Sequence, residues 1–85
     1  MASAPPLIHV TVHKKDGIVF EGNATSISST NEKGVFDILP MHTNFVAIIN
    51  TTLTIRVKDT VPTVLSIPRG IIHVKENVVN IFVGV

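Results

Sequence analysis

The sequence contains no cysteine, no tryptophan and no tyrosine, and only 15% of its 85 residues carry a charged side chain. Without cysteine, the chain has no disulfide framework, no thiolate nucleophile and no cysteine-ligated metal site. The formal net charge is only +1, and Lys14-Lys15 is the only adjacent basic pair. Because phosphate binding needs clustered cations, we expect no nucleic-acid partner.

A long apolar run is also missing, although 45% of the residues are hydrophobic. A membrane-spanning helix needs about 20 consecutive apolar residues, so we expect no direct insertion into a membrane. Residues 1–6, Met-Ala-Ser-Ala-Pro-Pro, have neither the basic nor the apolar region of a secretory signal. They are expected to form a flexible lead-in to one domain over residues 7–85.

The pattern that is present has a period of two. Ile8, Val10 and Val12 alternate with polar residues, and Leu53 and Ile55 begin a second such run. No segment of ten residues combines helical apolar spacing with good helix formers, whereas β-branched residues are common. Strands are predicted over 7–13, 18–27, 35–39, 46–49, 53–57, 63–67, 71–74 and 78–83.

The segments between the predicted strands contain turn-forming residues. Asp16-Gly17 and Glu76-Asn77 predict hairpins, and residues 28–34 predict a loop. The continuous apolar run 46–49 predicts a strand covered on both faces, followed by a turn at 50–52. The expected fold is all-β: an antiparallel two-sheet β-sandwich or flattened barrel of about eight to ten short strands.

Residues 34–45 form the most distinctive stretch, in which a short strand is expected to end before Pro40 and to lead into an exposed loop. The loop carries Met41, His42 and Phe45. Two apolar side chains around a polar one, on a loop between strands, are typical of a protein contact site. The other three phenylalanines, Phe20, Phe36 and Phe82, are expected in the core.

The four histidines do not indicate a metal site. His9 and His13 lie four positions apart, which on a strand separates them by roughly 13 Å. We expect His9, His13 and His73 to face solvent. Because the sequence also contains no G-x-S-x-G, H-E-x-x-H or P-loop motif, no catalytic residue and no cofactor are predicted.

Four segments together resemble the N-terminal domain of the F-type ATP synthase epsilon subunit, called delta in mitochondria: 16–22, 34–42, 69–74 and 77–82. The resemblance extends from Leu7 over nearly the whole chain. It implies a β-sandwich at the foot of the central stalk, a non-catalytic rotor subunit that couples proton transport to ATP synthesis. It also implies a peripheral position on the cytoplasmic face of the plasma membrane, or on the matrix or stromal face of an organelle inner membrane.

The resemblance also implies contact residues for two partners. Those for the gamma subunit are Met41, His42, Thr43, Phe45 and Ala47, and those for the ring of c subunits are Asn31, Glu32, Lys33, Gly34 and Val35. The sequence departs from the family at three positions. Val35 replaces a frequent acidic residue, Asn44 a proline and Thr52 a turn glycine.

The family commonly continues into a C-terminal helical domain, which in bacteria can inhibit ATP hydrolysis and sometimes bind ATP. This chain ends at Val85, so we expect that domain and its nucleotide to be absent. Two other functions remain open from the sequence. One is a free-standing β-sandwich module for protein interaction or ligand binding, which an apolar cavity between the sheets would favour. The other is a small hydrolase that depends on His42.

Overall fold

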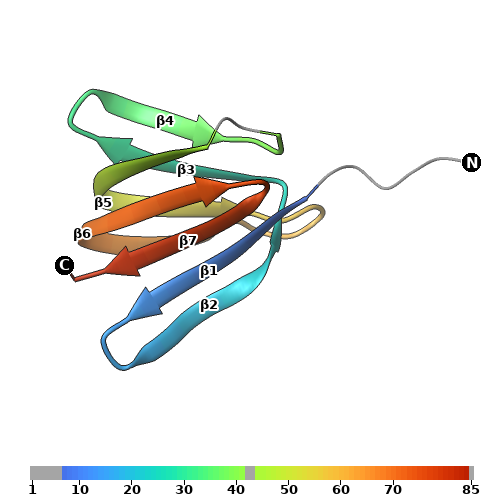
Figure 1. Ribbon diagram of the computed structural model, residues 1–85. Coiled ribbons are helices and arrows are strands. Elements are labelled where there is room, and N and C mark those ends of the chain that lie inside the picture. Colours follow the sequence, from blue (N-terminus) through green and yellow to red (C-terminus); the bar gives the residue numbers. More distant parts are fainter. Residues whose placement is uncertain (1–6, 42–43, 85) are drawn as a thin grey trace, which may run out of the picture.

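The computed structural model describes residues 7–41 and 44–84, and within them it contains seven strands and no helix (Figure 1). The strands are β1 (Ile8–Lys14), β2 (Gly17–Ala24), β3 (Ser26–Asn31), β4 (Gly34–Ile38), β5 (Phe45–Arg56), β6 (Thr63–Lys75) and β7 (Val78–Val83). The all-β prediction is confirmed. The predicted lead-in, residues 1–6, lies outside the described residues.

The strands form a single mixed sheet in the order β2-β1-β7-β6-β5-β3-β4. All neighbours are antiparallel except β1 and β7, which run parallel from the His9–Val78 pair to the His13–Phe82 pair. The prediction of two antiparallel sheets with about eight to ten short strands is therefore not confirmed in this detail, because the described residues form one sheet of seven strands with a parallel pair. Parallel neighbours need a long connection, and here almost the whole chain lies between the two strands.

Two long strands fold this single sheet over itself. β5 has 12 residues and β6 has 13, and their pairing is irregular between Ile49 and Thr51. Opposite this point, Pro68 and Arg69 have no assigned partner in β5. Figure 1 shows the two strands curling round, so that β3 and β4 lie on one side of the molecule and β1, β2 and β7 on the other.

The strands predicted separately over 46–49 and 53–57, and over 63–67 and 71–74, are the halves of β5 and β6. Residues 50–52 do not form a turn but belong to β5, and residues 68–70 bend inside β6. The run 46–49 is not covered on both faces, because Val46 and Ile48 are 63% and 52% exposed. Each half strand alternates normally, with one face towards the core and one towards solvent.

A further correction concerns the predicted loop 28–34, most of which is strand. β3 is rich in serine and threonine, yet it pairs with β4 on one edge and with β5 on the other. Ile27 is buried, and the buried Ser29 hydroxyl donates to the carbonyl of Thr52 at 2.8 Å. Pairing on both edges overrides the turn propensity of these polar residues.

The core between the layers is made of small and medium aliphatic side chains. Its buried members are Ile8, Val10, Val12, Ala24, Ile27, Ile38, Ile49, Leu53, Ile55, Ile67, Ile72, Val74, Val79 and Ile81. Phe20 and Phe36 are half-buried against it, as the sequence predicts. Phe45, which was expected on the exposed loop, is the first residue of β5 and is also half-buried against the core. Phe82 is not a core residue, because it faces outward and is 41% exposed.

Candidate functional site

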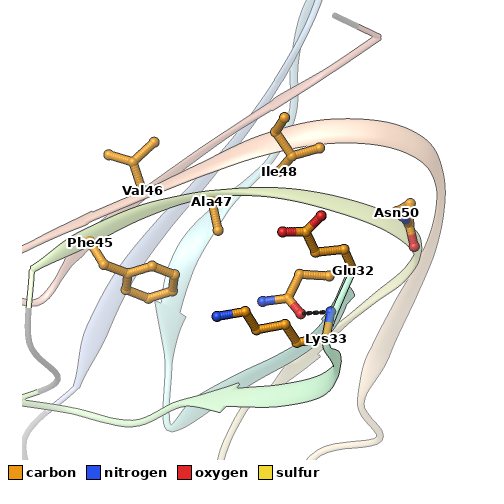
Figure 2. Close-up of a pocket in the computed structure, with 8 residues that line it drawn as sticks. Glu32, Lys33, Phe45, Val46, Ala47, Ile48 and Asn50 are labelled. Carbon is orange, nitrogen blue, oxygen red and sulfur yellow. Dashed lines mark hydrogen bonds between the residues drawn. The ribbon is translucent and has the colours of Figure 1, made fainter.

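Five of the predicted contact residues line one open hollow between the β3–β4 turn and the first half of β5. It has a volume of about 450 Å³ and is lined by Asn31, Glu32, Lys33, Phe45, Val46, Ala47, Ile48 and Asn50 (Figure 2). Three of these residues were assigned to the c ring and two, Phe45 and Ala47, to gamma. The structure therefore brings parts of both predicted contact sets together.

The wall from β3 and β4 is a tight hairpin turn. Asn31 accepts a hydrogen bond at its Oδ1 from the backbone N–H of Lys33 at 2.8 Å, which is an Asx turn. Gly34 has φ of +121°, a conformation that glycine adopts without a steric penalty. The turn directs β3 away from β5 after the Thr30–Asn50 pair and holds Glu32 and Lys33 at the hollow.

The wall from β5 has two different faces. In Figure 2, the side chains of Phe45 and Ala47 point into the hollow, whereas Val46 and Ile48 point away from it. The Phe45 ring meets the ring of Phe36 edge to face, with centroids 5.9 Å apart. Phe45 is thus held by the core while part of its surface stays accessible to a partner.

Gly34 and Val35, the other two residues predicted to face the c ring, lie outside the hollow lining. Val35 is 79% exposed and borders a separate, polar concavity on the outer face of β3, β4 and β5. At the centre of that concavity, Ser28 donates to the carboxylate of Asp37 and accepts from the guanidinium of Arg56.

Met41 is fixed at the surface by the β6–β7 turn. It is 77% exposed, and its backbone N–H donates to Oδ1 of Asn77 at 2.6 Å. The amide of Asn77 also donates to the Met41 sulfur at 3.5 Å. A third bond crosses the same gap, from the N–H of Glu76 to Oδ1 of Asn44 at 3.0 Å. His42 and Thr43, the central residues of the predicted gamma contact, lie outside the described residues.

The sequence indicates Asn77 only as a turn residue, so its second role, in holding Met41, was not predicted. The sequence signal for its second role is weak. Asn44 and Asn77 are amides on two distant predicted loops, and nothing local in the sequence indicates that the loops meet.

The outer face of β1, β2, β5, β6 and β7 carries an apolar row that sequence reasoning also missed. Cross-strand pairing aligns Ile48, Ile71, Phe82, His13 and Ile18 in one line across the sheet. The His13 ring stacks on Phe82 with centroids 4.7 Å apart, and its Nε2 hydrogen-bonds Oδ1 of Asn80 at 3.1 Å. The sequence does contain a signal for this row. Ile18, Ile71 and Phe82 are apolar at outward-facing positions, where a polar residue is usual.

The histidine predictions are therefore confirmed for His9 and His73, which are exposed. The prediction for His13 is wrong, because its ring is half-buried on Phe82. His9 instead lies beside Asn23 and Glu21, at 3.3 and 3.4 Å. Within residues 7–41 and 44–84, no three His, Asp or Glu side chains gather as metal ligands would, and no helix is long and apolar enough to cross a membrane.

Comparison with known proteins agrees with this architecture. A family model of the ATP synthase delta/epsilon chain β-sandwich domain matches residues 7–85. No curated protein sequence matches the chain significantly.

Two solved structures contain similar chains. One is the cryo-EM structure of the Euglena gracilis mitochondrial ATP synthase, OSCP/F1/c-ring, with a TM-score of 0.85 and 20% identity. The other is the central stalk and c ring of the Tetrahymena thermophila mitochondrial ATP synthase, with a TM-score of 0.70 and 17% identity. The alignments cover 96% and 89% of this chain, but only 53% and 62% of the two relatives. The likeness shows a shared fold over part of those longer chains.

Proposed function

The chain belongs to the ATP synthase delta/epsilon chain family through its β-sandwich domain, and on this premise we propose that it is a non-catalytic subunit of the F-type ATP synthase rotor. In this role it binds the gamma subunit and the c ring in the central stalk and helps to couple proton transport to ATP synthesis. The observation that carries the proposal is the family match over residues 7–85.

The form of the domain supports a coupling role. A subunit that joins two rotating partners needs a stiff scaffold and two contact surfaces, but no reactive group. The single hydrogen-bonded sheet, which folds around an aliphatic core, provides the scaffold. The described residues include no metal cluster, and the features that stand out on the surface are open hollows and apolar side chains, which are typical of protein contacts.

The two proposed contact surfaces meet at the hollow. We assign gamma binding to Met41, His42, Thr43, Phe45 and Ala47, and c-ring binding to Asn31, Glu32, Lys33, Gly34 and Val35. Because Glu32 and Lys33 face Phe45 and Ala47 across the same hollow, the two partners would lie close together on this end of the domain. The subunit would be peripheral, on the cytoplasmic face of the plasma membrane or the matrix or stromal face of an organelle inner membrane.

The gamma contact is tested by mixing the chain with gamma at micromolar concentration and measuring co-elution in size-exclusion chromatography. The parent chain is expected to co-elute. His42→Ala should weaken binding while the far-ultraviolet circular dichroism spectrum stays unchanged. The matched control is His73→Ala, an exposed histidine on β6 that pairs with Val46 but does not itself line the hollow, which should bind like the parent.

The two ways of failing are distinct. If the parent chain does not co-elute with gamma, the proposed function is contradicted. If the parent binds and His42→Ala binds equally well, the function stands and His42 is removed from the contact site.

A further inference from the structure

In the part of the chain that the structure describes, residues 46–49 of β5 have a strand neighbour on one edge alone. Residues 45–49 pair with β6 throughout, whereas β3 pairs with β5 only from Asn50 to Arg56. Among the described residues, no backbone hydrogen bond outside the sheet ladders reaches Val46, Ala47 or Ile48. Alternate residues of a strand direct their N–H and C=O groups to opposite edges, so part of the backbone of residues 46–48 faces away from β6, where the described residues provide no ladder partner.

The hollow lies along this edge. Four successive residues of β5, 45–48, contribute to its lining. Because successive side chains point to opposite faces of a sheet, four neighbours in sequence can border one hollow only along the edge of their strand. The hollow therefore occupies the place where β3 would continue if it did not turn away at Asn31.

The far side of the hollow limits what can enter. The β3–β4 turn lies across from the edge and directs Glu32 and Lys33 towards it (Figure 2). A neighbouring strand lies about 4.8 Å from its partner, so a segment that adds to this edge would lie directly between the edge and the turn. A second copy of this domain that paired through the same edge would have to bring its own β3–β4 turn into the same hollow.

We propose that this hollow binds one extended segment of another polypeptide, which adds as a strand to β5 at residues 46–48. Backbone hydrogen bonds to the open edge provide most of the recognition, as in other cases of strand addition. The side chains that face Phe45 and Ala47 should be apolar, and β-branched residues fit the strand conformation best. The inference does not rest on the rotor role, since it follows from the pairing of the sheet.

The test uses nuclear magnetic resonance of the isotope-labelled chain and a synthetic peptide that alternates valine and threonine, with a lysine at each end. The probe copies no natural partner sequence, so it reports on strand addition itself. Saturable shifts of the amide signals of Val46, Ala47 and Ile48 are expected, with slower solvent exchange for those that gain a bond. The same peptide with every amide N-methylated cannot donate to the edge and should give no such shifts.

A variant pair locates the binding. Glu32→Trp fills the hollow and should weaken peptide binding about fivefold or more. The matched control Glu21→Trp, an exposed position on β2, should bind like the parent. Circular dichroism of both variants confirms that they fold.

Three results would overturn the proposal. The first is no shift at these residues up to millimolar peptide. The second is equal binding of the N-methylated peptide, which would mean that side chains alone drive it. The third is a larger shift of the amide signals of residues 65–67. These residues belong to the first half of β6 and border another hollow, beside the β1–β2 hairpin.

Discussion

At the scale of single residues, Asn77 connects the end of the sheet to the loop that carries Met41. Its backbone has φ of 64°, a left-handed conformation that suits asparagine in a tight turn. Its carbonyl accepts from the N–H of His9 at 2.9 Å, and its side chain holds the N–H of Met41. One residue thus forms the β6–β7 turn, joins it to β1 and orders the proposed gamma contact.

Replacing Asn77 with glycine separates these roles, because glycine keeps the left-handed turn but removes both side-chain bonds to Met41. A neutral hydrogen bond contributes about 0.5–1.5 kcal/mol, so we expect gamma affinity to fall by about two- to tenfold. The melting temperature should fall only slightly. Amide exchange of Met41 and a binding titration measure the effect.

The control for this loop is Asn77→Asp, which keeps the acceptor for the Met41 N–H, loses the donor to sulfur and adds a negative charge at the surface. Its affinity should lie close to that of the parent. If Asn77→Gly binds gamma as tightly as the parent, the hydrogen bonds between Asn77 and Met41 do not contribute to gamma binding.

Burial of single side chains makes a second prediction at this scale. Ile81 is fully buried, whereas Ile48 is 52% exposed. Ile81→Ala should lower the free energy of unfolding by about 2–5 kcal/mol, and Ile48→Ala should change it by no more than about 0.5–1 kcal/mol. Urea denaturation measures both. Equal losses would show that the inward and outward faces have been assigned wrongly.

At the scale of the elements, the bend in β6 decides the architecture. Pro68 cannot donate to a ladder, and it lies where the β5–β6 pairing is interrupted. Before the bend the buried residue is Ile67, and after it the buried positions are Gly70 and Ile72. Two consecutive exposed residues, Pro68 and Arg69, therefore reverse the alternation and let both halves of the strand face the core.

Gly70 is the residue that this bend requires. A Cβ at position 70 would lie 2.8 Å from the backbone carbonyl oxygen of Phe82, and that oxygen belongs to the neighbouring strand. Gly70→Ala should therefore cost about 1–3 kcal/mol of stability through displaced backbone.

The matched control is Gly22→Ala on β2, where the added Cβ would meet only the Phe20 ring, at 3.7 Å. This variant should be neutral or slightly stabilising, since alanine loses less backbone entropy than glycine. Thermal unfolding of both variants checks the prediction. If Gly70→Ala melts no lower than Gly22→Ala, the close approach of β6 and β7 is wrong.

These elements also show what the sequence could and could not predict. Alternation alone places Ile8, Val10 and Leu53 correctly in the core, because each strand or half strand has one buried face. Alternation does not show that two half strands are one bent strand, so β5 and β6 were each divided. It also misses β3, whose serines and threonines are held in a strand by neighbours on both edges.

At the scale of the whole molecule, the closing contact joins the two ends of the sequence. The parallel pairing of β1 with β7 places the β1–β2 hairpin in the same sheet as the rest of the chain. No local pattern encodes a pairing between residues about 70 positions apart, which is why an antiparallel arrangement was predicted. The same limit applies to the site. The resemblance supplied Glu32 and Ala47 as members of two contact sets, but only the folded chain shows them around one hollow.

The rotor role is tested most directly by native mass spectrometry of ATP synthase purified from the energy-transducing membranes of the source organism. After the catalytic subunits are dissociated, we expect a remaining assembly of gamma and the c ring to retain one copy of the polypeptide that contains this sequence. A gamma and c-ring assembly that lacks this polypeptide, or a polypeptide recovered only in other complexes, would contradict the account.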